Sequence, residues 1–288
     1  KIAPEIEAKY SRTRLSGGEV LLTIVGSVGQ VAIAPMAVAG FNVARAVAVI
    51  HPHQDIGPEW ISLCLRSPLS QHLLNSRANT TVQTTINLKD LRALPIPIPP
   101  ANERREIYSV IGALDDRISL LRETNATLEA IAQALFKSWF VDFDPVRAKQ
   151  QGRPPESLDP ATAALFPDDF EDTELGPVPK GWRVANVEDV LELAYGKALK
   201  STDRIEGRVP VYGSGGITGF HNKSLVDGPS VIVGRKGTVG SLYWEDRPFF
   251  PIDTVFYVRT TRPLTYCYYM LQTLGLEHMN TDGAVPGL

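Results

Sequence analysis

The chain has 288 residues, of which 43% are hydrophobic and 21% charged, and its formal net charge is −3, which is typical of a globular protein with about two domains. Its two cysteines, Cys64 and Cys267, lie far apart without a CxxC or His-Cys motif, so neither a disulfide nor a zinc site is expected and a reducing cytosol fits best. No run reaches the ~18 apolar residues of a membrane span.

The first hundred residues predict a small glycine-rich β module. Segment 18–30, G-E-V-L-L-T-I-V-G-S-V-G-Q, is a short strand followed by a Gly-x-x-Gly turn and the start of a second strand, which predicts a hairpin. A strand at 46–49, a Pro-initiated helical stretch at 58–75 and a polar loop from Thr80 to Asn87 follow. The proline-rich segment L-P-I-P-I-P-P at 94–100 cannot be a central strand or a helix, so it closes the module.

A long helix is predicted next, from Asn102 to about Phe140. Its apolar positions alternate in steps of four and three, which is typical of a coiled-coil seam that packs against another helix. The seam consists of Ile107, Ile111, Leu114, Ile118, Leu121, Asn125, Leu128, Ala132, Leu135 and Trp139. Asn125 is the polar member of this seam, and such a residue can fix the register and the partner at some cost in stability. We interpret the helix as a rigid spacer.

The spacer helix is predicted to stop at W-F-V-D-F-D-P, residues 139–145, where Pro145 blocks continuation. We interpret Asp142 and Asp144 as surface acids at the helix end rather than as a metal site. Residues 150–181 are rich in Gln, Gly, Pro, Asp and Glu, and they predict an exposed linker with a short helical piece near 159–166. Trp182, after the linker, is expected to anchor a core.

A second module repeats the pattern of the first. Segment 229–241, P-S-V-I-V-G-R-K-G-T-V-G-S, matches 18–30 at an offset of 211, so that Gly26 and Gly29 correspond to Gly237 and Gly240. A strand at 255–258 and a Pro-initiated helical stretch at 263–279 complete the likeness, and G-A-V-P-G-L at 283–288 is the counterpart of 81–87. The second copy adds a further glycine-tipped hairpin at 209–220. Neither copy fits a Walker or a G-x-G-x-x-G phosphate loop.

Charge is divided unevenly along this plan. Residues 1–100 carry 9 basic and 6 acidic side chains, residues 101–180 carry 9 and 15, and residues 181–288 carry 11 and 11. The negative charge therefore belongs to the spacer and its exit, and binding of nucleic acid by the flanking modules stays open. His51 and His53 are weak evidence for a metal, and no nuclease, methyltransferase or hydrolase motif is recognisable, so we predict a binding protein without catalysis of its own.

Several segments together resemble one family. They are L-P-I-P-I-P-P-x-x-E-R-R-E-I at 94–107, A-L-F-K-S-W-F-V-D-F-D-P-V at 134–146, A-L-F-P-D-D-F-E-D-T-E-L-G-P-V-P-K-G-W at 164–182, V-Y-G-S-G-G-I-T-G at 211–219 and V-G-R-K-G-T-V-G at 233–240. The chain is similar here to the specificity (S) subunit of type I restriction-modification systems, over most of residues 18–288.

This resemblance implies an α+β fold with two target-recognition domains, mixed and glycine-rich in their β structure, separated by a long coiled-coil-type helix. It implies that residues 1–100 are the C-terminal part of the first recognition domain, 101–145 the spacer helix, 146–181 a linker, and 182–288 the N-terminal part of the second domain. Each domain would read one half of a bipartite sequence in double-stranded DNA. Methyltransferase (M) subunits would dock on the helix and bring S-adenosylmethionine, while restriction (R) subunits would bring ATP and Mg²⁺. The chain itself would bind no cofactor or metal.

The sequence departs from the family pattern because a second helix, antiparallel to the first, does not follow the second module. The front of the first module and the back of the second are absent too, and the chain starts at Lys1 without a signal peptide, so it resembles an internal piece of a longer protein. We therefore expect the seam to lack its intramolecular partner. The chain alone should be unstable or should pair its helix with a second chain.

The residues expected to touch DNA lie in the glycine turns, because glycine lets the backbone approach the duplex closely. In the second module these candidates are Tyr212, Ser214, His221, Asn222, Lys223, Arg235, Lys236 and Thr238, and in the first module they are Ser27, Gln30 and Arg45. Arg235 and Lys236 would contact phosphate or guanine. Two alternatives stay open, namely a coiled-coil scaffold that reads no DNA and a fragment of a fused restriction-methylation enzyme.

Overall fold

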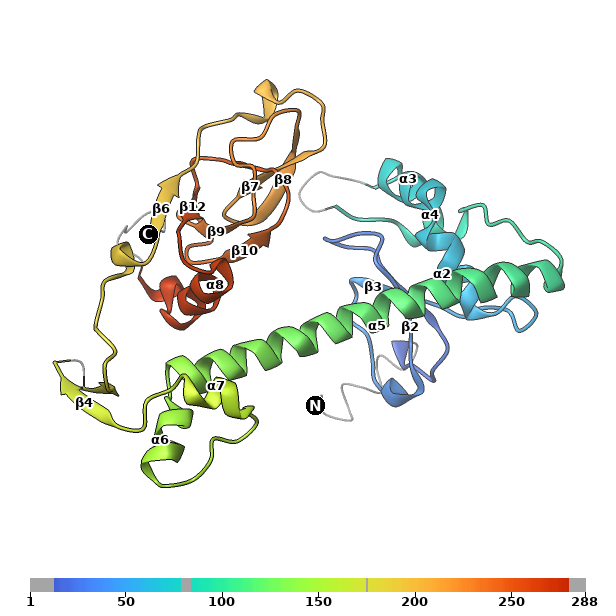
Figure 1. Cartoon of the computed structure of the whole chain (residues 1–288). Coiled ribbons are helices and arrows are strands. Elements are labelled where there is room, and N and C mark those ends of the chain that lie inside the picture. Colours follow the sequence, from blue (N-terminus) through green and yellow to red (C-terminus); the bar gives the residue numbers. More distant parts are fainter. Residues whose placement is uncertain (1–12, 79–83, 175, 280–288) are drawn as a thin grey trace. The chain divides into compact units, whose positions relative to one another are not determined.

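The computed structural model describes residues 13–78, 84–174 and 176–279 (Figure 1). They form short helices and small sheets on either side, in sequence, of one 40-residue helix, α5 (Ala101–Phe140). The chain divides into two compact units, Lys1–Thr124 and Asn125–Leu288, so α5 begins in one unit and ends in the other. The predicted α+β class, with a long helix between two sheet-rich modules, is confirmed.

The first unit is built on a three-stranded antiparallel sheet in the order β2-β1-β3. Its elements are β1 (Val20–Thr23), β2 (Val31–Ile33), the 3-10 turn η2 (Met36–Val38), β3 (Val47–Ile50), α2 (Pro58–Arg66), α3 (Pro68–Ser76) and α4 (Leu88–Arg92). Leu22, Leu74 and Ile86 are buried between the sheet and the segments that follow it. The helical stretch predicted at 58–75 is two helices, because Pro68 starts a new one and the Ser67 hydroxyl accepts a hydrogen bond from the Ser70 amide, with 3.2 Å between Oγ and N.

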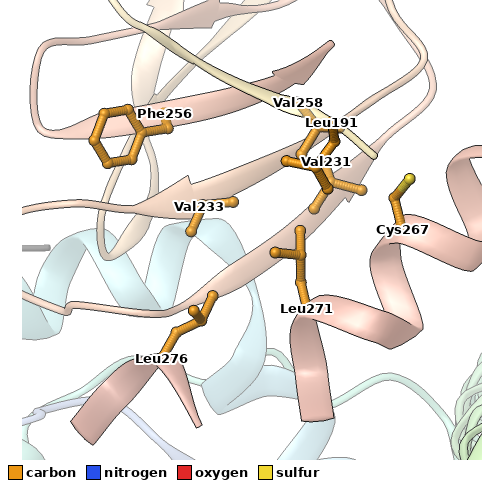
Figure 2. Packing of buried hydrophobic residues seen from close by; sticks show 8 residues of the cluster. All are labelled: Leu191, Val231, Val233, Phe256, Val258, Cys267, Leu271 and Leu276. Carbon is orange, nitrogen blue, oxygen red and sulfur yellow. The ribbon is translucent and has the colours of Figure 1, made fainter. Parts of the chain in front are cut away.

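The second unit contains a four-stranded sheet in the order β10-β9-β12-β6, whose faces pack on different elements. The strands are β6 (Glu192–Tyr195), β9 (Ser230–Gly234), β10 (Leu242–Glu245) and β12 (Val255–Arg259). One face packs on α8 (Leu264–Thr273) and η5 (Leu276–His278), as Figure 2 shows for Val233, Leu271 and Leu276. The other face packs on Tyr212 and Phe249 beside a second sheet in the order β11-β7-β8. That sheet is formed by β7 (Val209–Gly213), β8 (Gly216–His221) and β11 (Phe250–Pro251). Two 3-10 turns, η3 (Val187–Asp189) and η4 (Ser201–Asp203), also belong to this part of the chain.

The internal repeat is present in the backbone as well as in the sequence. Leu22 pairs with Val31 in the first unit, and Val233 pairs with Leu242 in the same register 211 residues later. The turns that close both hairpins make the same hydrogen bonds, since the amide of Gly29 donates to the Thr23 carbonyl (3.0 Å) and that of Gly240 donates to the Gly234 carbonyl (2.8 Å). In both units the first strand of the hairpin lies in the middle of three strands. It pairs with the second hairpin strand on one side and with a later strand on the other, so β2-β1-β3 corresponds to β10-β9-β12. The two modules are copies of one supersecondary unit.

Helix α5 matches the predicted spacer closely and carries one buried side chain, that of Phe136. The seam residues Ile107, Leu114, Ile118, Leu121, Leu128 and Leu135 are all exposed. The helix ends at Phe140, five residues before Pro145, because the Lys137 carbonyl accepts from the amides of both Val141 and Asp142 and Phe143 then takes a left-handed conformation. Pro145 instead lies in the first turn of the next helix. Asp142 pairs with Lys137, as expected for an acid at the helix end.

The segment predicted as an exposed linker is folded, which corrects that expectation. It contains α6 (Asp144–Gln150), α7 (Pro160–Ala164) and a hairpin of β4 (Phe170–Thr173) and β5 (Gly176–Pro179). α7 lies where the short helical piece was predicted. The ring of Phe166 packs against Trp139, and the ring of Trp182 stacks on Phe140, with 5.8 and 6.1 Å between their centroids. The linker prediction failed because these few aromatic side chains outweigh a polar composition.

Some expectations fall outside the described residues. These are the first half of the polar loop Thr80–Asn87, residues 80–83, and the counterpart segment at 283–288. Within the loop, the described part from Thr84 returns to the first hairpin, where the Gly26 amide donates to the Thr84 carbonyl and the Ile86 amide to the Ile24 carbonyl. Among the helices that the structure describes, none combines the length and apolar character needed to cross a lipid bilayer.

Candidate nucleic-acid interface

The two glycine turns of the second unit come together on one surface. The Ser214 carbonyl, in the turn between β7 and β8, accepts hydrogen bonds from the hydroxyls of Ser241 (2.6 Å) and Tyr243 (3.1 Å). A Cβ atom on Gly237 would lie 3.1 Å from the Ser214 hydroxyl oxygen. Four of the predicted site residues, Ser214, Arg235, Lys236 and Thr238, therefore share this surface, which we call the turn surface.

The loop from Arg235 to Ser241 is held in one conformation by its backbone. The amides of Arg235 and Lys236 both donate to the Thr254 carbonyl, at 2.9 and 3.1 Å. Gly240 has a φ of +74° and a Cβ there would lie 2.5 Å from the Glu277 amide, so only glycine fits. The side chains of Lys236 and Thr238 point to solvent from this fixed loop, which suits contact with a large rigid ligand.

Arg235 is fixed by its side chain as well. Its guanidinium carbon lies 5.0 Å from the ring centroid of Tyr195 and 5.7 Å from that of Phe256, and its Nη1 donates to the Asp253 carbonyl at 3.1 Å. Tyr195 is an additional candidate that was not predicted from the sequence. Its side chain is 64% exposed, so it is accessible to a ligand. The one sequence signal for a binding role is its position at the end of a strand, two residues before Lys197. This signal is weak because most aromatic residues in strands belong to the core.

Two predicted site residues are buried, and we correct their role. Tyr212 lies in the core and its hydroxyl donates to the buried carboxylate of Glu245, with 2.9 Å between the oxygens. Burial and the Glu245 charge raise the pKa of Tyr212 to about 12, so this donor stays protonated. The Nδ1 atom of His221 accepts from the Ile205 amide at 3.0 Å. Both side chains are buried inside the fold, where they support it, and neither is presented to a duplex.

The hydrogen bond between Tyr212 and Glu245 leads us to expect that the protein loses stability against unfolding in acid. Burial raises the pKa of Glu245, but hydrogen bonds from the side chain and backbone of Arg247 and from Tyr212 outweigh it and lower the pKa below its ordinary value. The ionised carboxylate thus contributes stability above the unfolded-state pKa, and this is lost as the pH falls through the lower folded-state pKa. We expect Glu245→Gln to flatten the loss of unfolding free energy below about pH 5, measured by urea denaturation at a series of pH values. An unchanged slope in the variant would show that another group titrates.

Asn222 and Lys223 are exposed but do not join the turn surface. They follow His221, which pairs with Val209 at the far end of the β7–β8 hairpin from Ser214. The sequence placed them near the turns because the hairpin is short, but an antiparallel hairpin separates its open end from its turn. They stay candidates for a separate contact with a long ligand.

In the first unit the predicted candidates lie at the equivalent end of the sheet. Ser27 is exposed in the hairpin turn, and its carbonyl accepts a hydrogen bond from the Thr23 hydroxyl. The Gln30 amide donates to the same hydroxyl at 3.0 Å. Arg45 is exposed just before β3, whose first residue pairs with Thr23, so Ser27, Gln30 and Arg45 are brought to one edge. Arg45 also lines a cavity of about 660 Å³ whose walls are mainly apolar.

The described residues offer no cluster of three or more His, Cys, Asp or Glu side chains that could hold a metal ion. His51 and His53 therefore have no third ligand among them. The Asp144 carboxylate instead accepts a hydrogen bond from the Ser138 hydroxyl at 2.7 Å, next to the helix end. The geometry of the turn surface, with basic side chains and backbone on a fixed loop, fits an anionic polymer.

Comparison with known proteins gives a family match. A family model described as "Type I restriction modification DNA specificity domain" matches residues 1–130 and 179–284. The chain is 32% identical to the type I restriction enzyme HindI specificity subunit of Haemophilus influenzae, over 57% of this chain and 45% of that protein. It is 31% identical to the EcoBI specificity subunit of Escherichia coli, over 46% of this chain and 30% of that protein. The chain thus spans less than half the length of these relatives.

A solved structure also resembles this chain. The S subunit of a type I restriction-modification system from M. genitalium aligns over 92% of this chain and 67% of its own, with 19% identity and a TM-score of 0.44.

Proposed function

The chain belongs to the type I restriction modification DNA specificity family, and we propose that it reads double-stranded DNA as part of the specificity subunit of a type I restriction-modification complex. Each module would read one half of a bipartite target. Most of the family match lies on the two modules and the first 30 residues of α5, which are the parts that this role requires.

One observation carries the proposal. The two modules share strand order and register, but their equivalent turns carry different side chains. Arg235 and Lys236 in the second module correspond to Ile24 and Val25 in the first. A common scaffold with different groups at its turns is what a protein needs to read two unlike half-sites, because phosphate contacts position a protein and base contacts specify the sequence. A coiled-coil scaffold alone has no use for this difference.

The partners follow from the same proposal. Methyltransferase subunits would dock along α5 and restriction subunits would join them, so that S-adenosylmethionine, ATP and Mg²⁺ would be bound by those subunits and catalysis would be theirs. The spacer helix would keep the two readers on one chain. Its exposed seam supports a helical partner, either from the continuing chain or from a second chain.

The direct test is to express the full-length protein with the methyltransferase and restriction genes beside it and to map methylated adenines in the host DNA. A motif in two parts, separated by unread base pairs, is the expected result. The matched experiment expresses the methyltransferase without this protein, and there the motif should vanish. A one-part motif, or the same motif without this protein, would contradict the proposal.

A further inference from the structure

We propose that Arg235 reads a guanine in the half-site of the second module and that Tyr195 holds the guanidinium for this contact. The inference rests on the proposed function and names one base contact of the turn surface. The arginine is unlike its neighbour Lys236, whose side chain extends freely into solvent, because three contacts restrain it. They are the rings of Tyr195 and Phe256 and the Asp253 carbonyl.

The direction of these contacts favours a base over a phosphate. Nη1 is engaged by the Asp253 carbonyl, while Nε and Nη2, which form one edge of the guanidinium, have no hydrogen-bond partner in the described part of the chain. Two parallel donors on one edge match the O6 and N7 acceptors that guanine presents in the major groove. A phosphate can also accept two such hydrogen bonds, but a mobile lysine such as Lys236 already binds phosphate as a point charge and needs no such restraint.

The position of the ring pair explains why Tyr195 is exposed. Tyr195 ends β6 and pairs with Phe256 across the sheet, and their rings meet edge to face with 4.9 Å between centroids. The guanidinium of Arg235 lies close to both rings, so they form an aromatic platform for it and the arginine enters the contact with little rotamer freedom left to lose. Tyr195 is therefore a positioning residue, whose effect on DNA acts through Arg235.

The first module lacks this device. The residue that corresponds to Arg235 is Ile24, which is buried and packs in the core with Leu22 and Ile86. The inference therefore applies to one half-site only.

The chain also contains a matched control. Arg259 is the last residue of β12, whereas the Arg235 amide bonds to Thr254, just before the first residue of that strand. Arg259 is also an arginine beside an aromatic ring, since its guanidinium carbon lies 5.1 Å from the ring centroid of Tyr257. It pairs with Glu192 across the sheet and is remote from the turn surface in the strand register. Arg259→Ala should leave DNA recognition unchanged.

The experiment uses the full-length protein assembled with its methyltransferase subunits. The probes are duplexes of about 30 base pairs that carry the mapped motif, each with one base pair of the second half-site exchanged. We expect Arg235→Ala to lower the preference for one G·C pair by roughly 5- to 150-fold and to leave the other positions unchanged. Arg235→Lys keeps the charge and should lose the same preference. Tyr195→Ala should lose part of it, and Tyr195→Phe should retain it because the ring remains.

The outcomes separate this inference from the proposed function. A wild-type complex that binds no duplex with the motif would contradict the proposed function itself. If the wild type binds, a uniform loss over all sequences with a salt slope reduced by about one would make Arg235 a phosphate contact and overturn the inference. A second half-site without guanine, or full discrimination in Arg235→Lys, would overturn it too. Equal loss in Tyr195→Phe and Tyr195→Ala would remove the platform role.

Discussion

Leu121→Asp in the full-length protein is expected to prevent α5 from pairing with its partner helix and to lower that affinity more than 100-fold. Leu121 is exposed and lies in the middle of the apolar seam of α5. Burial of one leucine in a helix pair contributes about 1.5–3 kcal/mol, and burial of an unpaired carboxylate costs several kcal/mol more. Since about 1.4 kcal/mol is a tenfold change, both effects together exceed two orders of magnitude.

Leu120→Asp is the matched control, because Leu120 is the neighbouring leucine and points away from the seam. The two side chains are similarly exposed, at 54% for Leu120 and 48% for Leu121. Sedimentation of the assembled complex measures the effect. Dissociation with Leu121→Asp and an intact complex with Leu120→Asp is the expected pair of results. If both variants stay assembled, the seam is not a helix-pairing surface.

The 288-residue chain without any partner is a second test of the role of the seam. We expect it to self-associate or to unfold easily, because six large apolar side chains of the seam are exposed in the described part of the chain. A monodisperse monomer that unfolds cooperatively in sedimentation and thermal melting would contradict this expectation.

The sequence predicted the repeat well because hairpin geometry is local. Positive φ angles at Gly26 and Gly237, and at Gly29 and Gly240, require glycine at fixed spacing, and this spacing sets the register of the strands beside it. The spacer helix was equally predictable from the sequence, since its apolar residues alternate in steps of four and three over more than four heptads. Local pattern therefore determines both kinds of element.

The failures share a different cause. Tyr212 has the sequence context of a turn residue, but its side chain faces inward because a strand alternates its two faces. The aromatic cluster around Phe140 joins residues from 136 to 269, and no local pattern signals contacts over that separation. The platform under Arg235 likewise joins β6 to a loop forty residues later. Long-range contacts determine which turn residues are free to bind, so candidate sites are less predictable than elements.

Phe136→Ala is expected to lower the unfolding free energy of the second unit by about 3–5 kcal/mol, which is the usual cost of removing a buried phenylalanine. Phe136 is the buried residue of α5, and its ring lies 5.0 Å from Phe140, 5.5 Å from Tyr266 and 5.9 Å from Tyr269 by centroid distance. The Tyr269 hydroxyl also donates to Glu129 at 3.2 Å. These contacts attach α8, and with it the four-stranded sheet on which α8 packs, to the C-terminal half of α5.

Ile131→Ala is the control for this change, because Ile131 lies on the same helix and is half exposed, so its loss should cost less than about 0.5 kcal/mol. Urea denaturation gives the total effect, and hydrogen exchange shows where it acts. Helix α8 and the end of α5 share the aromatic cluster, whereas β9 and β12 also pack on Tyr212 and Phe249 through their other face, so faster exchange should appear first in the two helices. Equal acceleration in the strands would mean that helix and sheet form one cooperative unit. In that case the spacer helix contributes directly to the stability of the reader it carries.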